Sequence, residues 1–464
     1  MKRLTKKQMW IFAIGQLGWS ILGGIINAWL VTFYLPTADD ISNGAITFIK
    51  GGFVFWVLTI LGIITFICRI FDAVTDPLVA TLSDRSKNPR GRRIPFMRYA
   101  AIPFAICTIL VFWAPVDKIS TLNSFWILGF LLLFYFFMTM YCTPYNALIS
   151  EFGKTEDDRM YISTAISLTY FGGTVLAYLP FVFGGVLQKF VSFNTSYRIC
   201  FIILAVIATI CMLLPTFLLK EKDFVDAKPS EANAFKSLAA TFKNKDFRVF
   251  VGSDIAYWIG LTLFQTGLPF FVKVSMKLDA SYTMIFLAAM TILSACFYPI
   301  VSKFVKKFGK KKMTIAGFLG LALSYIITSL IGLISLPGII FGILIVITAA
   351  FPMALLGIIP QSIVADIAEE DAIKTKEKRE GMFFASRTFA MKLGQSIAML
   401  AFTSLAIIGA NQEVGANDIV ASSFGLRLVS IVAIFFCLLG AVVLFFYNEK
   451  GVNEIIRKDK ENKE

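Results

Sequence analysis

The chain has 464 residues, of which 57% are hydrophobic and only 16% are charged. An ordinary soluble domain carries about 25% charged residues, so this composition excludes a water-soluble globular protein. Apolar runs recur along the chain at the length, roughly 20 residues, that lets a helix cross the hydrocarbon core of a bilayer. A membrane β-barrel would alternate apolar and polar residues, whereas runs such as 125–138 and 338–350 are continuous.

The net charge of +14 does not require a nucleic-acid partner. The basic residues lie in short loops between apolar runs, which is typical of loops facing the anionic, cytoplasmic surface of a membrane. We therefore expect a lipid bilayer, and no nucleic acid, around this chain. The seven Cys lie in or beside apolar runs and are interpreted as small buried apolar residues. The basic segment 1–7 leads into a run longer than that of a signal peptide, which predicts a first span that is retained.

The apolar runs predict about twelve membrane spans. In chain order they cover residues 10–34, 52–82, 94–114, 123–149, 161–187, 198–219, 247–272, 280–302, 312–334, 337–365, 381–410 and 424–447. A long polar stretch separates the sixth span from the seventh. We therefore predict an all-α membrane protein of twelve transmembrane helices in two six-helix halves. The halves are residues 1–219 and 247–447, with a cytoplasmic central loop at 220–246 and a cytoplasmic tail at 448–464.

The basic residues also predict the orientation of the chain. Segments 83–98 and 301–312 are rich in Arg and Lys, whereas the loops on the other side of the predicted membrane carry few bases. The excess of bases marks the cytoplasmic side, so both termini should be cytoplasmic. Gly91-Arg92-Arg93 after the second span is echoed by Gly309-Lys310-Lys311 after the eighth. Repeated halves of this kind are typical of transporters that work by alternating access.

Two carboxylates inside the second predicted span are the strongest functional signal. Asp72 and Asp76 are four residues apart and should share one helix face, with Arg69 one turn away. A carboxylate that faces lipid costs about 2.5–3.5 kcal/mol, so this face should point into the bundle. Two close carboxylates repel, and either a cation lies between them or one keeps its proton. Thr75 offers a further hydroxyl to a cation such as Na⁺.

Cation coupling is the favoured interpretation of these acids, and a self-neutralised structural ion pair is the alternative. Pro77 should free the carbonyl of Ala73 and kink the span, or else be tolerated near a helix end. At the cytoplasmic end of the same span, four charged residues are candidates for a gating latch or for plain orientation signals. These residues are Asp84, Arg85, Arg92 and Arg93.

The second half has its own ionisable residues within predicted spans. Lys392 lies halfway along the eleventh span, where its ammonium cannot reach water and needs a carboxylate or a polar cavity. Asp72, Asp76 and Asp254 are the candidate partners. Lys392 is interpreted as a substrate contact or an ion-pairing residue. Asp254, near the cytoplasmic side of the seventh span, is either a gating charge or a structural one.

Aromatic and amide residues predict a polar substrate site. An indole ring offers a flat face on which a sugar can stack, and amides supply donors and acceptors for hydroxyl groups. The candidates are Gln16, Trp19, Ser20, Tyr145, Asn146 and Gln395. Packing within a membrane protein is the alternative explanation for each of them.

The chain has no His, no Walker A sequence and no dinucleotide-binding glycine motif. We therefore expect no enzymatic activity and no cofactor, and an ion gradient as the energy source. The coupling cation should be Na⁺ or H⁺, with no metal site beyond a possible Na⁺ at Asp72 and Asp76.

The segment Arg69-Ile-Phe-Asp72-Ala-Val-Thr-Asp76-Pro77 resembles the second-span motif of the glycoside–pentoside–hexuronide:cation symporters, the melibiose permease group of the major facilitator superfamily. The resemblance extends over almost the whole chain. It implies that the two acids ligate Na⁺, Li⁺ or H⁺ and that Thr139 completes the site. Val364-Ala-Asp366 and Lys392, with Gly394 and Ser396, match further motifs of the family.

The sugar-binding half of the resemblance is incomplete. The best-known permease of the family has Lys-Asp where this chain has Trp19-Ser20, an acid at the position of Cys142, and tryptophan at the position of Asn146. We expect a monomeric symporter of the cell (inner) membrane that couples a cation to a sugar, glycoside or uronide. A lipid or lysolipid transporter on the same fold is the alternative, and a membrane sensor without flux is a third hypothesis.

Overall fold

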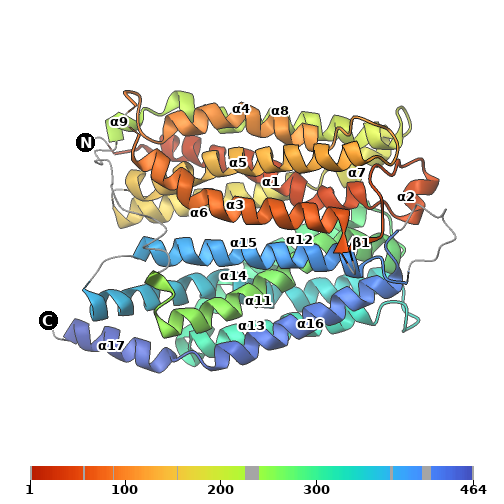
Figure 1. Cartoon of the computed structure of the whole chain (residues 1–464). Helices are drawn as coiled ribbons and strands as arrows, with labels where there is room; N and C mark the ends of the chain where they lie inside the picture. Colours follow the sequence, from red (N-terminus) through yellow and green to blue (C-terminus); the bar gives the residue numbers. More distant parts are fainter. Residues whose placement is uncertain are drawn as a thin grey trace. The chain divides into compact units, whose positions relative to one another are not determined.

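The computed structural model describes residues 3–55, 58–86, 88–153, 155–224, 240–376, 380–409 and 420–461. Two compact units contain these residues. The first holds residues 3–224 and Val420, and the second holds residues 240–409 and 421–461. Both are built almost entirely of long helices (Figure 1), as the continuous apolar runs predict.

The first unit packs its long helices in a defined set of pairs: α1 lies against α6 and α8, α4 against α5 and α8, and α3 against α5. Its elements are α1 (Lys6–Tyr34), α2 (Ala38–Ser42), β1 (Phe53–Phe55), β2 (Leu58–Thr59), α3 (Ile60–Asp84), α4 (Ile94–Val111), α5 (Thr121–Phe152), α6 (Glu156–Leu176), α7 (Pro180–Leu187), α8 (Phe193–Leu218) and α9 (Glu221–Phe224).

The second unit repeats this pattern of pairs: α11 lies against α15 and α16, α13 against α14 and α16, and α12 against α14. Its elements are α11 (Lys245–Phe270), the π-helix η1 (Phe271–Ser275), α12 (Ser281–Phe308), α13 (Lys310–Ser329), α14 (Gly338–Thr375), α15 (Glu380–Leu405), α16 (Ser423–Phe445) and α17 (Glu449–Glu461). The repeated halves predicted from the basic turns are therefore also repeated in their helix packing.

In each unit a glutamate carboxylate accepts hydrogen bonds from the first backbone N–H groups of one helix, and that of Glu221 is buried. Glu221 accepts hydrogen bonds from the backbone N–H groups of Arg92, Arg93 and Ile94, at 2.8, 2.9 and 2.9 Å. Glu449 does the same at α13, where it accepts from Lys310 at 2.6 Å and Lys311 at 3.2 Å. The first N–H groups of a helix have no partner within the helix, and the helix dipole favours a negative charge there.

Glycine makes room for both carboxylates. Gly91 and Gly309 have φ angles of +126° and +87°, which disfavour a residue with a side chain. A Cβ atom at Gly91 would also lie 2.3 Å from Oε2 of Glu221. The glycine of each basic turn is thus explained by the carboxylate that binds the following N–H groups.

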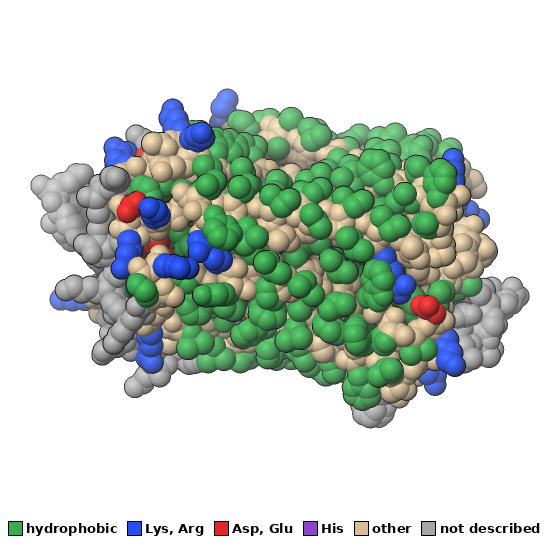
Figure 2. Space-filling model, turned by 90° about the horizontal axis from the view of Figure 1, so that it is seen from above, with side chains coloured by type: hydrophobic (Ala, Val, Ile, Leu, Met, Phe, Trp, Pro, Cys, Tyr) green, Lys and Arg blue, Asp and Glu red, His purple; other side chains and the backbone are tan. Residues whose placement is uncertain are grey.

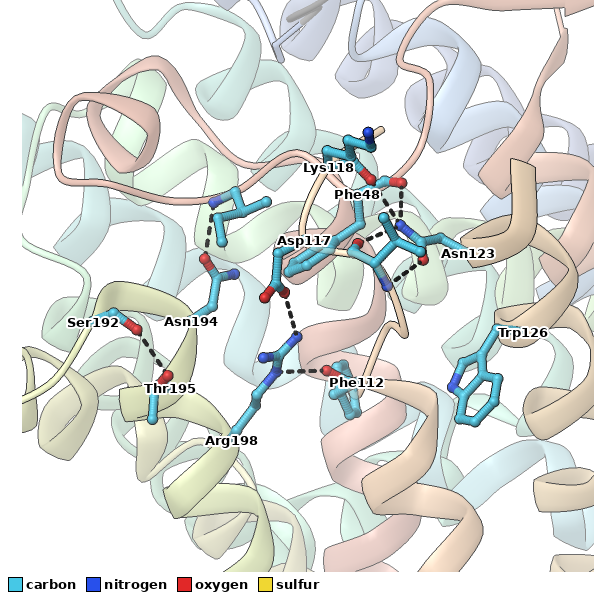
Figure 3. Close-up of polar contacts among 12 residues, drawn as sticks. Phe48, Phe112, Asp117, Lys118, Asn123, Trp126, Ser192, Asn194, Thr195 and Arg198 are labelled. Carbon is cyan, nitrogen blue, oxygen red and sulfur yellow. Dashed lines mark hydrogen bonds and ion pairs between the residues drawn. The ribbon is translucent and has the colours of Figure 1, made fainter. Parts of the chain in front are cut away.

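An arginine binds the opposite end of the same helices. Nε of Arg198 donates to the carbonyl of Phe112, just after α4, at 3.0 Å, and an ion pair of 4.0 Å joins Arg198 to Asp117; Figure 3 shows both contacts. In the second unit Arg427 donates to the carbonyl oxygens of Ser329 at 3.1 Å and Ile331 at 3.4 Å, at the end of α13.

The loop that precedes α3 is held in place by hydrogen bonds and a cation–π contact. Nδ2 of Asn123 donates to the carbonyl of Phe48 at 2.8 Å, and Oδ1 of Asn194 accepts from the N–H of Ile46 at 2.8 Å (Figure 3). The guanidinium of Arg198 also lies over the ring of Phe48, 5.3 Å from its centre. These contacts fix the entry into α3, which carries the paired acids.

Two of the predicted spans differ from the observed elements. The run 52–82 was expected to be helical throughout, but 53–55 and 58–59 pair as a short antiparallel hairpin and α3 begins only at Ile60. Thr59 caps this helix by accepting from the N–H of Gly62 at 3.1 Å. The predicted span 161–187 stands as one candidate membrane span, but its helix is interrupted between α6 and α7, because Pro180 has no N–H group to continue the first helix.

Among the described residues, ten helices are long and apolar enough to cross a membrane. The long helices α3 and α15 are not among the ten, and both carry ionisable residues within their apolar sequence. On the face shown in Figure 2, apolar side chains cover the middle, and Lys and Arg gather toward its two ends. This distribution is that of a protein whose middle lies in hydrocarbon.

Candidate functional site

The structure brings Asp72 and Asp76 of α3 together with a threonine of α5. The hydroxyl of Thr139 lies 3.0 Å from Oδ1 of Asp72 and 3.2 Å from Oδ1 of Asp76. Asp72 and Thr139 are fully or almost fully buried, with exposures of 0% and 1%. Three oxygen atoms from two neighbouring helices therefore converge in the interior of the first unit.

The two close contacts between Thr139 and the carboxylate oxygens cannot both be hydrogen bonds donated by Thr139. Thr139 has a single hydroxyl hydrogen and can donate to only one of the two carboxylates at a time. The other contact then joins two oxygen atoms with no hydrogen between them, unless one carboxyl group is protonated. A proton or a metal cation removes this repulsion, and either would bind where the two acids meet.

Arg69 is held next to these acids by residues of three helices. Its guanidinium donates to Oδ1 of Asn27 at 2.7 Å, lies 3.9 Å from Oδ2 of Asp72, and stacks over Tyr135 with 4.9 Å to the ring centre. Only 8% of Arg69 is exposed. Arg69 thus places a buried positive charge next to Asp72.

Thr75 and Pro77, two further residues of the predicted motif, contribute to the local structure of α3. The hydroxyl of Thr75 donates to the carbonyl of Asp72 at 3.0 Å, so its hydrogen is directed at its own helix. Pro77 lies inside α3, which continues to Asp84. Thr81 donates to the carbonyl of Pro77 at 2.8 Å.

Two of the predicted gating residues, Arg92 and Arg93, meet an acid at the turn between α3 and α4. The guanidinium groups of Arg92 and Arg93 form ion pairs with Oε1 of Glu151, at 3.0 and 3.1 Å. Arg85 is exposed at the end of α3, and the side chain of Asp84 lies outside the described structure. Glu151 was not among the predicted residues, although Ile149-Ser-Glu151 near the end of α5 is similar to Val364-Ala-Asp366 in α14.

The two similar sequences also make similar ion pairs in the structure. Asp366 pairs with Lys310, which begins α13, just as Glu151 pairs with Arg92 and Arg93 at the start of α4. An acid on the fourth long helix of each half thus binds the basic turn of that half. Repetition of the motif was the signal that would have identified Glu151.

In the second unit, Asp254 is bound by an arginine that the sequence analysis did not single out. Nε and Nη2 of Arg387 donate to Oδ2 and Oδ1 of Asp254 at 2.9 and 3.0 Å. Asp254 is 3% exposed, so this bidentate pair is almost fully desolvated. Lys392 follows on the same helix, α15, and is buried with 6% exposed. It belongs to a different unit from Asp72 and Asp76.

The predicted substrate residues lie in different surroundings. Gln16 is buried and donates to the hydroxyl of Ser20 at 3.0 Å. Tyr145 is fully buried, donates to the carbonyl of Phe12 at 2.9 Å and stacks on its ring, so it packs α5 against α1. Asn146 is exposed and Gln395 is half-buried.

Trp19 differs from Trp10 and Trp29, the two other tryptophans of α1, because Nε1 of Trp10 donates to the hydroxyl of Tyr161 at 3.0 Å. Within the described residues, Nε1 of Trp19 is buried and has no hydrogen-bond partner. Nε1 of Trp29 donates to the carbonyl of Ala177 at 3.1 Å. A buried donor without a partner is costly unless a ligand or water binds it, and this sets Trp19 apart as a candidate contact.

Long apolar helices, repeated packing in two units and buried charges on α3 and α15 define a membrane transporter. A crystal structure of the nucleoside transporter NupG has a similar fold, with a TM-score of 0.61 at 15% identity, over 96% of this chain and 99% of that one. The family model described as "MFS/sugar transport protein" matches residues 11–449. The chain belongs to this family, as its resemblance to cation symporters of the major facilitator superfamily led us to expect.

Curated relatives span most of the chain. The "Uncharacterized symporter YjmB" of Bacillus subtilis (strain 168) is 26% identical over 88% of this chain and 84% of its own length. The "Putative sulfoquinovose importer" of Escherichia coli (strain K12) is 25% identical, with 100% and 96% covered. The "Sodium-dependent lysophosphatidylcholine symporter 1-A" of Danio rerio is 23% identical, with 98% and 89% covered.

Proposed function

We propose that the chain is a secondary transporter that couples the movement of a cation, Na⁺ or H⁺, to symport of a sugar, glycoside or uronide. The observation that carries the proposal is the placement of Thr139 between the carboxylates of Asp72 and Asp76, at 3.0 and 3.2 Å. Two carboxylates and a hydroxyl supply the oxygen ligands that a hard cation prefers. Coupling follows if substrate binding depends on a cation bound at these oxygens.

The oxygen spacing also suits a small metal cation. Adjacent ligands of an octahedral ion lie about 1.4 bond lengths apart, or about 3.3–3.7 Å for the bonds of about 2.3–2.6 Å that Ca²⁺ makes. Na⁺ has nearly the same radius. The contacts between Thr139 and the two acids are slightly shorter than this, so a small outward movement of the side chains accommodates the ion.

For the architecture, we propose that α3 and α15 cross the membrane together with the ten apolar helices. The chain then has twelve spans in two halves, 1–219 and 247–447, joined by the loop 220–246, with both termini cytoplasmic. The burial of Arg69, Asp72 and Lys392 supports this, because their charges are then shielded from lipid. The protein would act as a monomer in the cell (inner) membrane, without enzymatic activity or a further cofactor.

For substrate contacts we propose the residues predicted from the sequence, apart from Tyr145, which packs α5 against α1. They are Gln16, Trp19, Ser20 and Asn146 in the first unit and Lys392 and Gln395 in the second. Trp19 offers a ring and an indole donor, and the others carry polar groups that can form hydrogen bonds. A cation on α15 would suit a uronide or another acidic sugar. The relative named for import of sulfoquinovose, a sugar with an acidic group, is in keeping with this substrate class.

Uptake into proteoliposomes tests the proposal. The purified chain would be reconstituted and supplied with labelled sugars, glycosides, uronides and sulfoquinovose under an imposed Na⁺ gradient or an imposed proton gradient. We expect accumulation of at least one substrate that collapses when the gradient is removed and is lost in Asp72→Asn. Uptake that ignores both gradients would refute the coupling, and unchanged accumulation in Asp72→Asn would refute the site.

Lysolipid transport is the second candidate. It is favoured by the loss of acids at Trp19-Ser20 and Cys142, which makes the region less polar than in sugar permeases that it resembles, and by the relative named for lysophosphatidylcholine. The same proteoliposomes would be given a fluorescent lysophosphatidylcholine. Gradient-driven movement of this lipid, with no transport of any sugar in the panel, would replace the first candidate by the second.

A further inference from the structure

We propose that Thr143 is an additional ligand of the coupling cation and that it biases the site toward a metal cation over a proton. The inference rests on the proposed function, because it assigns a role within the cation site. Thr143 lies on α5 one helical turn after Thr139, and its hydroxyl is 3.5 Å from Oδ1 of Asp76. It was not among the residues that the sequence singled out.

The two helices present matched pairs of oxygen-bearing side chains. On α3, Asp72 and Asp76 are four residues apart, and on α5, Thr139 and Thr143 are four residues apart. Because α3 packs against α5, the first threonine contacts both acids and the second contacts only Asp76. The site therefore extends along the helices by one turn beyond Thr139.

Proline follows the second member of each pair. Pro77 comes directly after Asp76, and Pro144 comes directly after Thr143, and both lie inside their helices. A proline has no N–H group for the carbonyl four residues earlier. The carbonyl oxygens of Ala73 and Met140 are thus released from the helical pattern, each one residue after Asp72 or Thr139. Both helices share the pattern of two polar residues with proline after the second.

Hydroxyl oxygens distinguish a metal cation from a proton. A threonine hydroxyl has two lone pairs and is not a base near neutral pH, so it adds nothing to a proton held on a carboxylate beyond a hydrogen bond. A hard cation such as Na⁺ gains a ligand from each oxygen that it can reach. Thr143 therefore lowers the free energy of the metal-bound site more than that of the protonated site.

The experiment uses the full chain in detergent or nanodiscs and measures binding of radioactive Na⁺ at alkaline pH, where proton competition is small. Thr143→Val keeps the shape of the side chain and removes the hydroxyl, and Thr143→Ser keeps the hydroxyl. Thr108→Val is the matched control, since Thr108 is buried on α4 and its hydroxyl donates to the carbonyl of Phe104 at 2.8 Å.

We expect Thr143→Val to raise the Na⁺ concentration for half-saturation about tenfold, in the range seen when groups supporting a metal site are removed. Thr143→Ser and Thr108→Val should stay close to the unmodified chain. Proton-driven uptake without Na⁺ should change less than about twofold in Thr143→Val, because the carboxylates that hold the proton are intact.

Three results would overturn the inference. Unchanged Na⁺ binding in Thr143→Val would show that the hydroxyl is not a ligand. Equal losses in Thr143→Val and Thr143→Ser would indicate a packing role. A chain that accumulates substrate on a proton gradient but binds neither Na⁺ nor Li⁺ would refute the inference and leave the proposed symport standing, whereas uptake that follows no gradient would refute the proposed function itself.

Discussion

Arg198 and Glu221 bind opposite ends of the same helix, α4. Glu221 accepts from the first N–H groups of this helix, and Arg198 donates to the carbonyl of Phe112 at its other end. Each charge complements the end of the helix dipole that it meets. Arg427 and Glu449 bind α13 in the same way. In each pair, the arginine lies on the last long helix of its half and the glutamate lies just after that helix.

The first prediction concerns Glu221. Replacing it by Ala leaves three buried or partly buried N–H groups without an acceptor, at a cost of about 1–3 kcal/mol for each unsatisfied group that water cannot reach. We expect Glu221→Ala to lower the midpoint of thermal unfolding in detergent, and Glu221→Gln to lower it less. Glu454→Gln on α17 is the control, because Glu454 is exposed and forms an ion pair with Lys458 one turn away. A Glu221→Ala chain as stable as this control would contradict the assignment.

The second prediction compares two threonines of the cation site. Thr139→Val removes the hydroxyl that contacts both carboxylates, whereas Thr75→Val removes one that donates to its own helix. We expect the concentration of cation that gives half-maximal uptake to rise about tenfold or more in Thr139→Val. The effect of Thr75→Val should be several times smaller. If both variants raise the cation concentration for half-maximal uptake equally, the Thr75 oxygen contributes as much to cation binding as the Thr139 oxygen.

The third prediction concerns Asp254 and Arg387. Breaking a buried ion pair by removing one partner costs about 3–5 kcal/mol, because the other charge remains buried. Asp254→Asn and Arg387→Gln should each lower the thermal midpoint by several degrees. The double variant should recover part of the loss, since neither charge is then left alone. Additive losses in the double variant would show that the two residues are not coupled.

The sequence predicted those features that depend on neighbours along the chain. Hydropathy located the long helices, and a spacing of four residues placed Asp72 and Asp76 on one face. Thr139 followed from the family resemblance, since nothing in its local sequence indicates an acid on another helix. Arg387 and Thr143 were missed because each acquires its partner only when distant helices pack, whereas Glu151 was indicated by a repeated motif that went unused. The hairpin before α3 was missed because Phe53, Val54 and Leu58 are as apolar as a span, and hydropathy does not distinguish an apolar strand from an apolar helix.

The last prediction compares Trp19 and Trp29, two of the three tryptophans of α1. In the described structure the indole N–H of Trp19 has no partner, whereas that of Trp29 donates to Ala177. Phenylalanine keeps an aromatic ring and removes the donor, so Trp29→Phe leaves the carbonyl of Ala177 without this bond and should lower the thermal midpoint. Trp19→Phe removes an unsatisfied donor and should leave the midpoint unchanged or raise it. If Trp19 binds substrate, the same variant should raise the KM for uptake while Trp29→Phe does not. A Trp19→Phe chain with lower stability and unchanged KM would instead make Trp19 a packing residue.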